Sequence, residues 1–386
     1  MPDLYNVKSD CCGCSACHDA CPKKAIIMVE DSEGFRYPVI NETKCINCNL
    51  CERICPTKNI KQNHSLLESY AAYNLDEQIR LESSSGGIFT LLAYEVLNNN
   101  GVVYGAAFDQ SFEVRHIRVD NVNDLPKLRG SKYAQSNCDN IFEFCKEDLN
   151  NGKEVLFTGT PCQVAAVKSF LNKEYDNLLC MDIICHGVPS RKIWRSYVEY
   201  RVNFAKSKIA QIAFRLKNEG WKQYAVKFTF ANLTAYCQKF PKDIFMRGFL
   251  SDLYLRPSCY KCGFKTKERI SDVTVADFWG IDKMHPEWDD DKGMTLLVVH
   301  STKGKAVIEK IKNGFFIEKI NLDDAIIFNT AMVRSVAEHK RRKEFFDRVS
   351  NGEEVWLLVD KFTKHSIASR IKQKIKSVIK RLLFRK

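Results

Sequence analysis

The spacing of hydrophobic and polar residues changes several times along the chain, and each change predicts a different element. Beyond residue 66, short apolar runs bounded by Gly, Asn and Asp alternate with longer stretches of helical period. The short runs predict strands at 69–74, 101–109, 113–119, 154–160, 178–187, 208–216, 224–231, 234–240, 272–280 and 294–301. The longer stretches predict helices at 138–152, 161–173, 190–204, 302–314 and 83–99, the last opening on a Ser/Gly turn.

The order of these elements indicates how the strands pair. Helix and strand alternate between residues 138 and 204, which predicts right-handed crossovers between parallel strands. The three runs between residues 208 and 240 have no helix between them and predict an antiparallel excursion. We therefore expect an α+β or α/β fold class with a mixed α/β region at its centre.

The first 60 residues differ in composition from the rest of the chain and cannot form a large hydrophobic core. They are dense in Cys, Gly, Asn and Pro, so a bound cofactor must hold them together. The chain has seventeen cysteines, no secretory signal pattern and no apolar run of the roughly 18 to 20 residues that would cross a bilayer. We expect a cytoplasmic protein, whose reduced thiols bind metal instead of forming a disulfide framework.

Two cysteine runs carry the strongest chemical signal. Both follow the spacing C-x2-C-x2-C-x3-C-P of bacterial two-cluster ferredoxins, in which the fourth cysteine of each run binds the other cluster. Zinc is the alternative, but a zinc tetrahedron gives no reason for two triplets each followed by Cys-Pro. Cys12 is expected to be a bystander thiol, with a shift of register as the alternative. The expected [4Fe-4S] ligands are Cys11, Cys14, Cys17 and Cys55 for one cluster, and Cys45, Cys48, Cys51 and Cys21 for the other.

Four further cysteines are expected to bind a third [4Fe-4S] cluster. Cys162 and Cys185 follow two strands of one βαβ unit, at the edge of an open sheet where ligands bind. If these strands are neighbours they lie about 5 Å apart, which brings both thiols within reach of one cluster. Cys259 and Cys262 add a C-x2-C pair typical of metal sites. A zinc half-site and a redox dithiol are the alternatives for that pair.

Most of the formal charge of +12 lies at the carboxyl end of the chain. Residues 365–386 contain eight Lys and Arg and no acidic residue, around an apolar stripe of Ile367, Ile371, Ile375 and Ile379. This pattern favours an amphipathic helix attached to an anionic membrane surface, and a helix packed on protein is the alternative. No aromatic platform or recognition motif accompanies the charge, so nucleic acid is not an expected partner.

Several further motifs follow one another along the chain. They are SSGG at 84–87, GSKYAQS at 130–136, GTPCQVAA at 159–166, DIICHGVPS at 182–190, the Cys259/Cys262 pair and SDVTVADFWG at 271–280. With these motifs the chain resembles the coenzyme F420 hydrogenase/dehydrogenase beta-subunit family, preceded by a bacterial-type two-cluster ferredoxin domain, over about residues 1 to 330. The resemblance implies non-covalently bound FAD, a cluster held by cysteines of the third domain, and hydride exchange between FAD and coenzyme F420 or another organic substrate.

The same motifs supply the expected flavin-binding residues. A Ser/Gly turn at a helix start presents N–H groups and a dipole that favour phosphate. A capped helix start or a plain turn is the alternative. His186 is the candidate proton donor, and a histidine bonded to backbone is its alternative. The expected cofactor-binding residues are Ser84, Ser85, Gly86, Gly87, Gly130, Ser131, Lys132, Tyr133, Gly159, Thr160, Gln163 and Asp277.

The expected organisation has four parts. A two-cluster ferredoxin domain spans 1–62, an α/β domain 66–150, an α/β domain with the third cluster and FAD 151–330, and a helical tail 331–386. The expected function is an iron–sulfur flavoprotein oxidoreductase that passes electrons from ferredoxin or another one-electron carrier through clusters and FAD to an organic acceptor. The alternative is an electron-transfer subunit that serves a partner enzyme. We expect the protein in the cytoplasm, at the inner face of the membrane if the tail binds lipid. The sequence does not decide whether it forms an oligomer.

Overall fold

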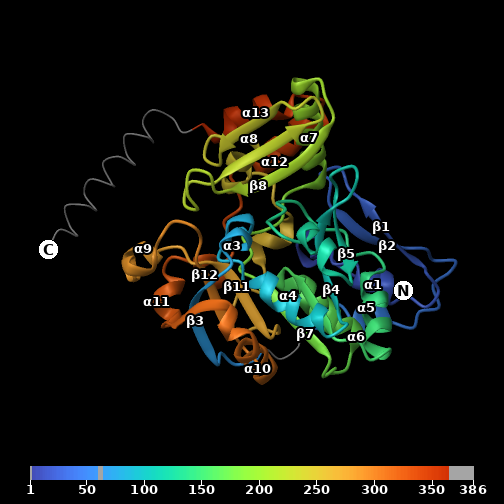
Figure 1. Cartoon of the computed structure of the whole chain (residues 1–386). Coiled ribbons are helices and arrows are strands. Elements are labelled where there is room, and N and C mark those ends of the chain that lie inside the picture. Colours follow the sequence, from blue (N-terminus) through green and yellow to red (C-terminus); the bar gives the residue numbers. More distant parts are fainter. Residues whose placement is uncertain (1, 60–63, 365–386) are drawn as a thin grey trace.

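A mixed eight-stranded sheet forms the centre of the computed structural model, which describes residues 2–59 and 64–364 (Figure 1). The strand order is β13-β3-β12-β11-β7-β6-β4-β5. The four strands β4, β6, β7 and β11 run parallel, as the strand–helix alternation predicts, and the outer pairs are antiparallel. The strands are β3 (Glu68–Asn74), β4 (Val102–Phe108), β5 (Val114–Val119), β6 (Val155–Gly159), β7 (Leu178–Ile183), β11 (Val273–Asp277), β12 (Thr295–Val299) and β13 (Phe315–Lys319).

Strand β3 enters this sheet between β12 and β13. Strands from residues 66–150 and from residues 151–330 therefore belong to one sheet, and the expected boundary at residue 150 does not separate two sheets. The linear order of elements did not reveal this, because the pairing of β3 with β12 joins residues more than 200 positions apart.

Helices cover both faces of the sheet because its central strands are apolar on both sides. Val155 and Phe157 of β6 belong to the core beneath α5 and α6, whereas Leu156 belongs to the core beneath α4 and α10. The helices of this region are α3 (Glu77–Glu82), α4 (Ile88–Asn98), α5 (Ile141–Asn150), α6 (Pro161–Leu171), α9 (Ile281–Met284), α10 (Thr302–Ile311) and α11 (Leu322–Ile326).

A second unit lies above the large sheet in Figure 1. Its antiparallel sheet, of order β10-β9-β8, confirms the antiparallel pairing predicted for residues 208–240. Rings such as Trp194, Tyr197 and Phe228 fill its core, and Trp356 from the expected helical tail packs among them. The elements are β8 (Ile209–Leu216), β9 (Ala225–Phe230), β10 (Ala235–Lys239), α7 (Arg191–Ala205), α8 (Ile244–Leu250), α12 (Arg342–Ser350) and α13 (Val355–Thr363).

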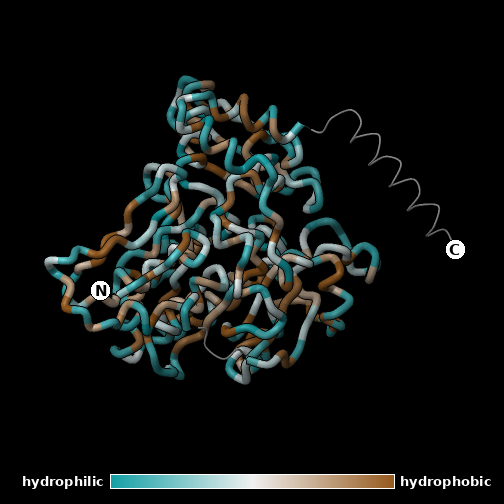
Figure 2. Tube along the Cα trace, turned by 180° about the vertical axis from the view of Figure 1, so that it is seen from behind, coloured by the Kyte–Doolittle hydropathy of each residue, from teal (hydrophilic) through white to brown (hydrophobic). Residues whose placement is uncertain are grey.

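The amino-terminal region is small and packs against α5 and α6. The Asp19 carboxylate accepts hydrogen bonds from the backbone N–H groups of Asn140 (2.8 Å) and Phe142 (3.2 Å), which fixes the region to the start of α5. Figure 2 shows hydrophobic stretches at its outer edge. Ile27 of β1 and Val39 of β2 are exposed. Its elements are η1 (Lys8–Asp10), α1 (Ala16–Asp19), β1 (Ile26–Glu30), β2 (Arg36–Ile40) and α2 (Leu50–Arg53).

The remaining short helices are η2 (Val122–Lys127), η3 (Pro257–Lys261), η4 (Pro286–Trp288), η5 (Lys312–Gly314) and η6 (Thr330–Met332). Within the described ranges, no helix has the length and apolar character needed to span a bilayer. The predicted amphipathic helix at 365–386 lies outside the described residues.

Candidate functional site

The two cysteine runs fold alike around two separate points. In each run, two residues between the cysteines adopt left-handed backbone: Gly13 (φ 69°) and Ser15 (φ 71°) in the first, Asn47 (φ 55°) and Asn49 (φ 56°) in the second. These turns precede the one-turn helices α1 and α2. The local chain therefore curls each run around its own centre.

The fourth cysteine of each run reaches the other centre. Burial raises the pKa of Cys17 well above its usual value, and the charges of Cys11 and Cys55 add to the effect, so Cys55 lies with the first run. Cys14 is likewise in electrostatic contact with Cys17 and Cys55. A small cavity is lined by the second group, Cys21, Cys45, Cys48 and Cys51. The structure thus brings the cysteines together in the two predicted sets.

A third set of thiols converges where β6 and β7 end. These strands are parallel neighbours, with Gly159 opposite Asp182, as the proposed reach of both thiols requires. Burial raises the pKa of Cys185, and the nearby charges of Cys259, Cys162 and Cys262 raise it further. The backbone N–H of Val188 donates to the Cys259 Sγ at 3.4 Å. In residues 2–59 and 64–364, no three His, Cys, Asp or Glu side chains form a group suited to one metal ion.

Cys162 is positioned by the start of α6. Thr160 precedes the helix, Pro161 is its first residue, and the Gln163 Oε1 accepts from the Thr160 backbone N–H at 2.9 Å. This reciprocal cap fixes the turn that carries Cys162. Cys12, which belongs to neither predicted ferredoxin set, lies within hydrogen-bonding reach of both Cys14 and Cys162. Cys12 therefore lies between the first set of thiols and the third.

A cavity of about 740 Å³ opens beside the third set of thiols, with Cys185 and His186 in its wall. All the predicted cofactor-binding residues line it except Gly86. The N–H of Gly86 donates to the Thr295 Oγ1 at 2.9 Å, and a Cβ at this position would lie 2.5 Å from the Ala72 carbonyl oxygen. Gly86 therefore lets the loop pack on the sheet, and its N–H is not free to bind phosphate.

The first two motifs meet directly at the cavity wall. The Ser131 backbone N–H donates to the Ser84 Oγ at 2.8 Å, and the two serine hydroxyls are also 2.8 Å apart. Lys132 donates to the carbonyls of Lys127 and Arg129, both at 2.9 Å, and burial lowers the pKa of Lys132 to about 7. As an ammonium it would have one further N–H to donate.

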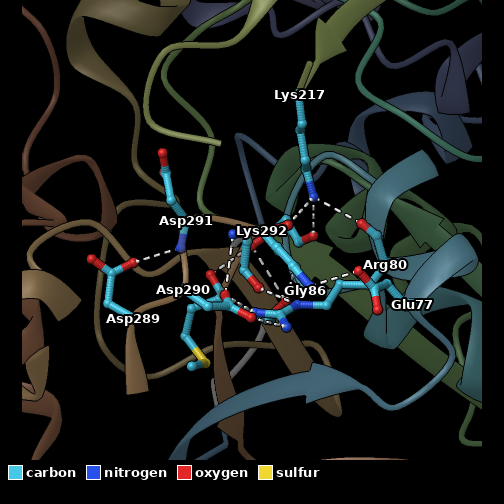
Figure 3. A network of polar contacts seen from close by, with 12 residues as sticks. Glu77, Arg80, Gly86, Lys217, Asp289, Asp290, Asp291 and Lys292 are labelled. Carbon is cyan, nitrogen blue, oxygen red and sulfur yellow. Dashed lines mark hydrogen bonds and ion pairs between the residues drawn. The ribbon is translucent and has the colours of Figure 1, made fainter. Parts of the chain in front are cut away.

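A polar network holds the Ser84–Ser85 loop from outside the cavity (Figure 3). The Lys217 Nζ donates to the carbonyls of Arg80 (2.8 Å), Ser85 (2.6 Å) and Lys292 (2.8 Å). Burial lowers the pKa of Lys217 to about 7, while three acceptors favour the ammonium form, which alone has three N–H bonds. Arg80 in turn forms an ion pair with Asp290 at 2.6 Å. The polar turn near residue 290 thus braces the loop.

Arg215 is a cavity residue that sequence reasoning missed. It lies on β8, and its guanidinium donates to both oxygens of Asp277 (2.7 and 2.9 Å) and to the Ser84 carbonyl (3.1 Å). Its buried Nε has no hydrogen-bond partner within the described residues. Asp277 also accepts from the Trp221 Nε1 at 2.9 Å, so this carboxylate positions Arg215. The available signal was an arginine after Phe214 in a mostly apolar strand.

His186 is held at the cavity wall by an acidic partner. Its Nε2 lies 2.7 Å from the Asp252 Oδ1, and its ring centroid lies 5.0 Å from that of Phe249. The predicted alternative was a backbone hydrogen bond, whereas the partner in the structure is a carboxylate. This contact orients the ring and leaves the other ring nitrogen for further bonding.

His116 is a second histidine of the cavity that the sequence did not single out. Its Nε2 lies 2.9 Å from the Thr158 carbonyl and so carries the proton, while its Nδ1 accepts from the Ser136 hydroxyl at 2.7 Å. The ring is neutral in this arrangement. Burial lowers the pKa of His116 to about 4.

We expect His116 to make the protein less stable in acid. Its folded pKa of about 4 is below the usual 6.5, so its contribution is complete above pH 6.5 and is lost as the pH falls through 4. The loss amounts to about 3 kcal/mol at about 1.36 kcal/mol per pKa unit. The urea midpoint, followed by tryptophan fluorescence from pH 7.5 to 5, should fall less steeply in His116→Gln than in the wild type. Identical slopes would contradict this assignment.

Comparison with known proteins matches three parts of the chain to family models. The model of the coenzyme F420 hydrogenase/dehydrogenase beta subunit matches in two parts, its N-terminal part over residues 69–143 and its C-terminal part over residues 152–325. The 4Fe-4S dicluster domain matches residues 10–59. No curated protein matches the chain.

Among solved structures, one chain of the F420-reducing [NiFe] hydrogenase complex from Methanosarcina barkeri, in a xenon-derivatization study, is 16% identical. The alignment covers 75% of this chain and 95% of that one, with a TM-score of 0.49. The two parts of the beta-subunit model together span more than half of the sequence. The chain therefore belongs to the coenzyme F420 hydrogenase/dehydrogenase beta-subunit family and carries a 4Fe-4S dicluster domain at its amino-terminal end.

Proposed function

We propose that this protein is an iron–sulfur flavoprotein oxidoreductase with three [4Fe-4S] clusters and one FAD. The observation that carries the proposal is the third set of thiols, Cys162, Cys185, Cys259 and Cys262, of which Cys185 lines the large cavity. Two ferredoxin-type cysteine sets and a ligand cavity would otherwise be separate features. The third set connects them.

The residues present fit both groups. Each proposed cluster site offers four thiolates, the donors that hold [4Fe-4S] clusters in proteins. The cavity offers cations at Lys132 and Arg215 for an anionic cofactor, and flat rings at Tyr133 and Trp279 for an aromatic one. When bound, the clusters would transfer single electrons and FAD would combine two of them for hydride transfer.

The remaining residues have supporting roles in this proposal. Ser84, Gly130 and Ser131 bring backbone and hydroxyl groups to the cofactor, and Arg215 supplies positive charge. His186 would donate a proton, with Asp252 holding its ring. The donor would be ferredoxin or another one-electron carrier in the cytoplasm, and the acceptor coenzyme F420 or another organic molecule. Attachment to an anionic membrane through residues 365–386 belongs to the same proposal.

Metal and flavin analysis after anaerobic purification tests this assignment. Three clusters of four irons each predict about twelve irons, with matching sulfide, and one FAD per chain. A measured content of about eight iron atoms per chain would show that the third cluster is absent. Cys259 and Cys262 would then have a zinc-binding, redox or structural role. A colourless protein with bound zinc would overturn the whole proposal.

A second function follows from the family's place as a subunit. The chain would then deliver electrons to a partner enzyme and have no small-molecule substrate. Reduced, flavin-loaded protein distinguishes the two: oxidation by coenzyme F420 or another small acceptor supports the enzyme, and oxidation only by a partner protein supports the subunit.

A further inference from the structure

Arg256 is a fully buried arginine where the ferredoxin-type region meets the rest of the chain, with an exposed fraction of 0%. Its Nε donates to the Cys11 carbonyl at 2.8 Å, and its Nη2 donates to the Arg36 carbonyl at 3.0 Å. Its Nη1 donates to the Gln135 Oε1 at 3.1 Å. The same Nη2 lies 3.7 Å from the Cys11 Sγ. These partners are neutral oxygens and one thiol, and they come from both sides of the junction.

The charges that act on Arg256 belong largely to cysteines. Burial lowers the pKa of this guanidinium, and Cys11, Tyr37, Cys12 and Cys259 raise it, with a net upward result. A buried cation is costly unless an anion compensates it. Cys11 belongs to the first thiol set and Cys259 to the third, so the thiolates that would hold clusters at these two sites would supply the compensation.

The surrounding chain is built to hold this guanidinium. A Cβ on Gly13 would lie 2.6 Å from the Arg256 Nη1, so only glycine fits between the first cysteines of the run. The ring centroid of Tyr37 lies 4.4 Å from the guanidinium carbon, and that of Phe35 lies 5.6 Å from it. The position of the charge relative to Cys11 is therefore fixed.

We propose that Arg256 is a positioning residue that raises the reduction potential of the cluster held by Cys11, Cys14, Cys17 and Cys55. The inference rests on the proposed function, because it needs clusters at these sites. Reduction adds one negative charge to a cluster, and a hydrogen bond or a buried cation at its sulfur stabilises that charge. The effect is largest at the cluster of Cys11, smaller at that of Cys259, and negligible at that of Cys21, Cys45, Cys48 and Cys51.

The test is an EPR-monitored redox titration of the anaerobic holoprotein in the wild type, Arg256→Met and Arg256→Lys. Arg342→Met is the matched control. Arg342 is also buried and also joins this junction, through Glu33 at 3.1 Å and the Leu255 carbonyl at 3.1 Å. Within the described residues, it donates hydrogen bonds to Glu33 and Leu255 and none to a cysteine.

We expect Arg256→Met to make reduction of the first cluster at least about tenfold less favourable, a shift of about 59 mV to lower potential. The second ferredoxin cluster should not shift, and Arg342→Met should leave both unchanged. Arg256→Lys keeps the positive charge but loses the planar set of guanidinium N–H donors, so the potential of the first cluster should shift in the same direction by less. If the methionine variant loses iron, the lysine variant provides the test. No shift, or an equal shift in Arg342→Met, would overturn the inference while wild-type clusters still support the proposed function. Wild-type protein without clusters would instead refute the proposed function.

Discussion

Replacing Cys162 with serine is expected to remove about four of about twelve irons and to stop a one-electron carrier from reducing the flavin. The loss should be confined to the third site, because Cys162 belongs to the third set of thiols and to neither of the two ferredoxin sets. The EPR signals of the two ferredoxin clusters should therefore remain. Iron analysis and stopped-flow measurement of flavin reduction by reduced ferredoxin check both parts.

Cys12→Ser is the matched control for this experiment. Cys12 is in hydrogen-bonding reach of Cys162 but lies outside the proposed ligand sets, so its loss should leave the iron content near twelve. Equal iron loss in the two variants would make Cys12 a ligand and would contradict the predicted register of the first run. Retention of all the iron in Cys162→Ser would remove Cys162 from the third site.

Arg215→Met is expected to weaken flavin binding and to destabilise the fold. The substitution removes a cation from the cavity wall and leaves Asp277, whose side chain is 16% exposed, without its main partner. Removing one member of a buried ion pair costs about 3–5 kcal/mol. We expect flavin affinity, measured by fluorescence on adding FAD to flavin-free protein, to fall at least about tenfold, which is about 1.4 kcal/mol.

The double variant Arg215→Met/Asp277→Asn separates the two effects. It removes the uncompensated carboxylate, so the urea midpoint should recover towards the wild-type value while flavin affinity stays low. Recovery of flavin binding together with stability would show that Arg215 acts only through folding. Wild-type affinity in the single variant would remove Arg215 from the cofactor site.

The parts of the site that sequence predicted are those in which local spacing determines geometry. Each cysteine run curls around its own centre because the turns and one-turn helices between the cysteines are local features. The strand–helix unit around Cys162 could also be predicted, because an apolar run, Gly-Thr-Pro and a stretch of helical period follow one another. The loops 84–87 and 130–136 were found by family motif, and the structure brings them into contact.

The residues that sequence missed depend on long-range pairing. Arg215 and His116 sit on strands whose alternation predicts only which side they face, and Lys217 directly follows β8. Their significance comes from partners far along the chain, such as Asp277 for Arg215 and Thr158 for His116. Arg256 is the clearest case, because 245 positions separate it from Cys11.

The sequence by itself determined the 4Fe-4S dicluster domain, the mixed α/β class and most elements, because ligand spacing and hydrophobic period act over a few residues. Only the tertiary structure decided which segments share a sheet and which thiols meet. It also decided which charges the cavity and the domain junction enclose. The physical reason is that burial and hydrogen-bond partners are set by packing of distant segments. That packing places β3 between β12 and β13, and Arg256 between two thiol sets.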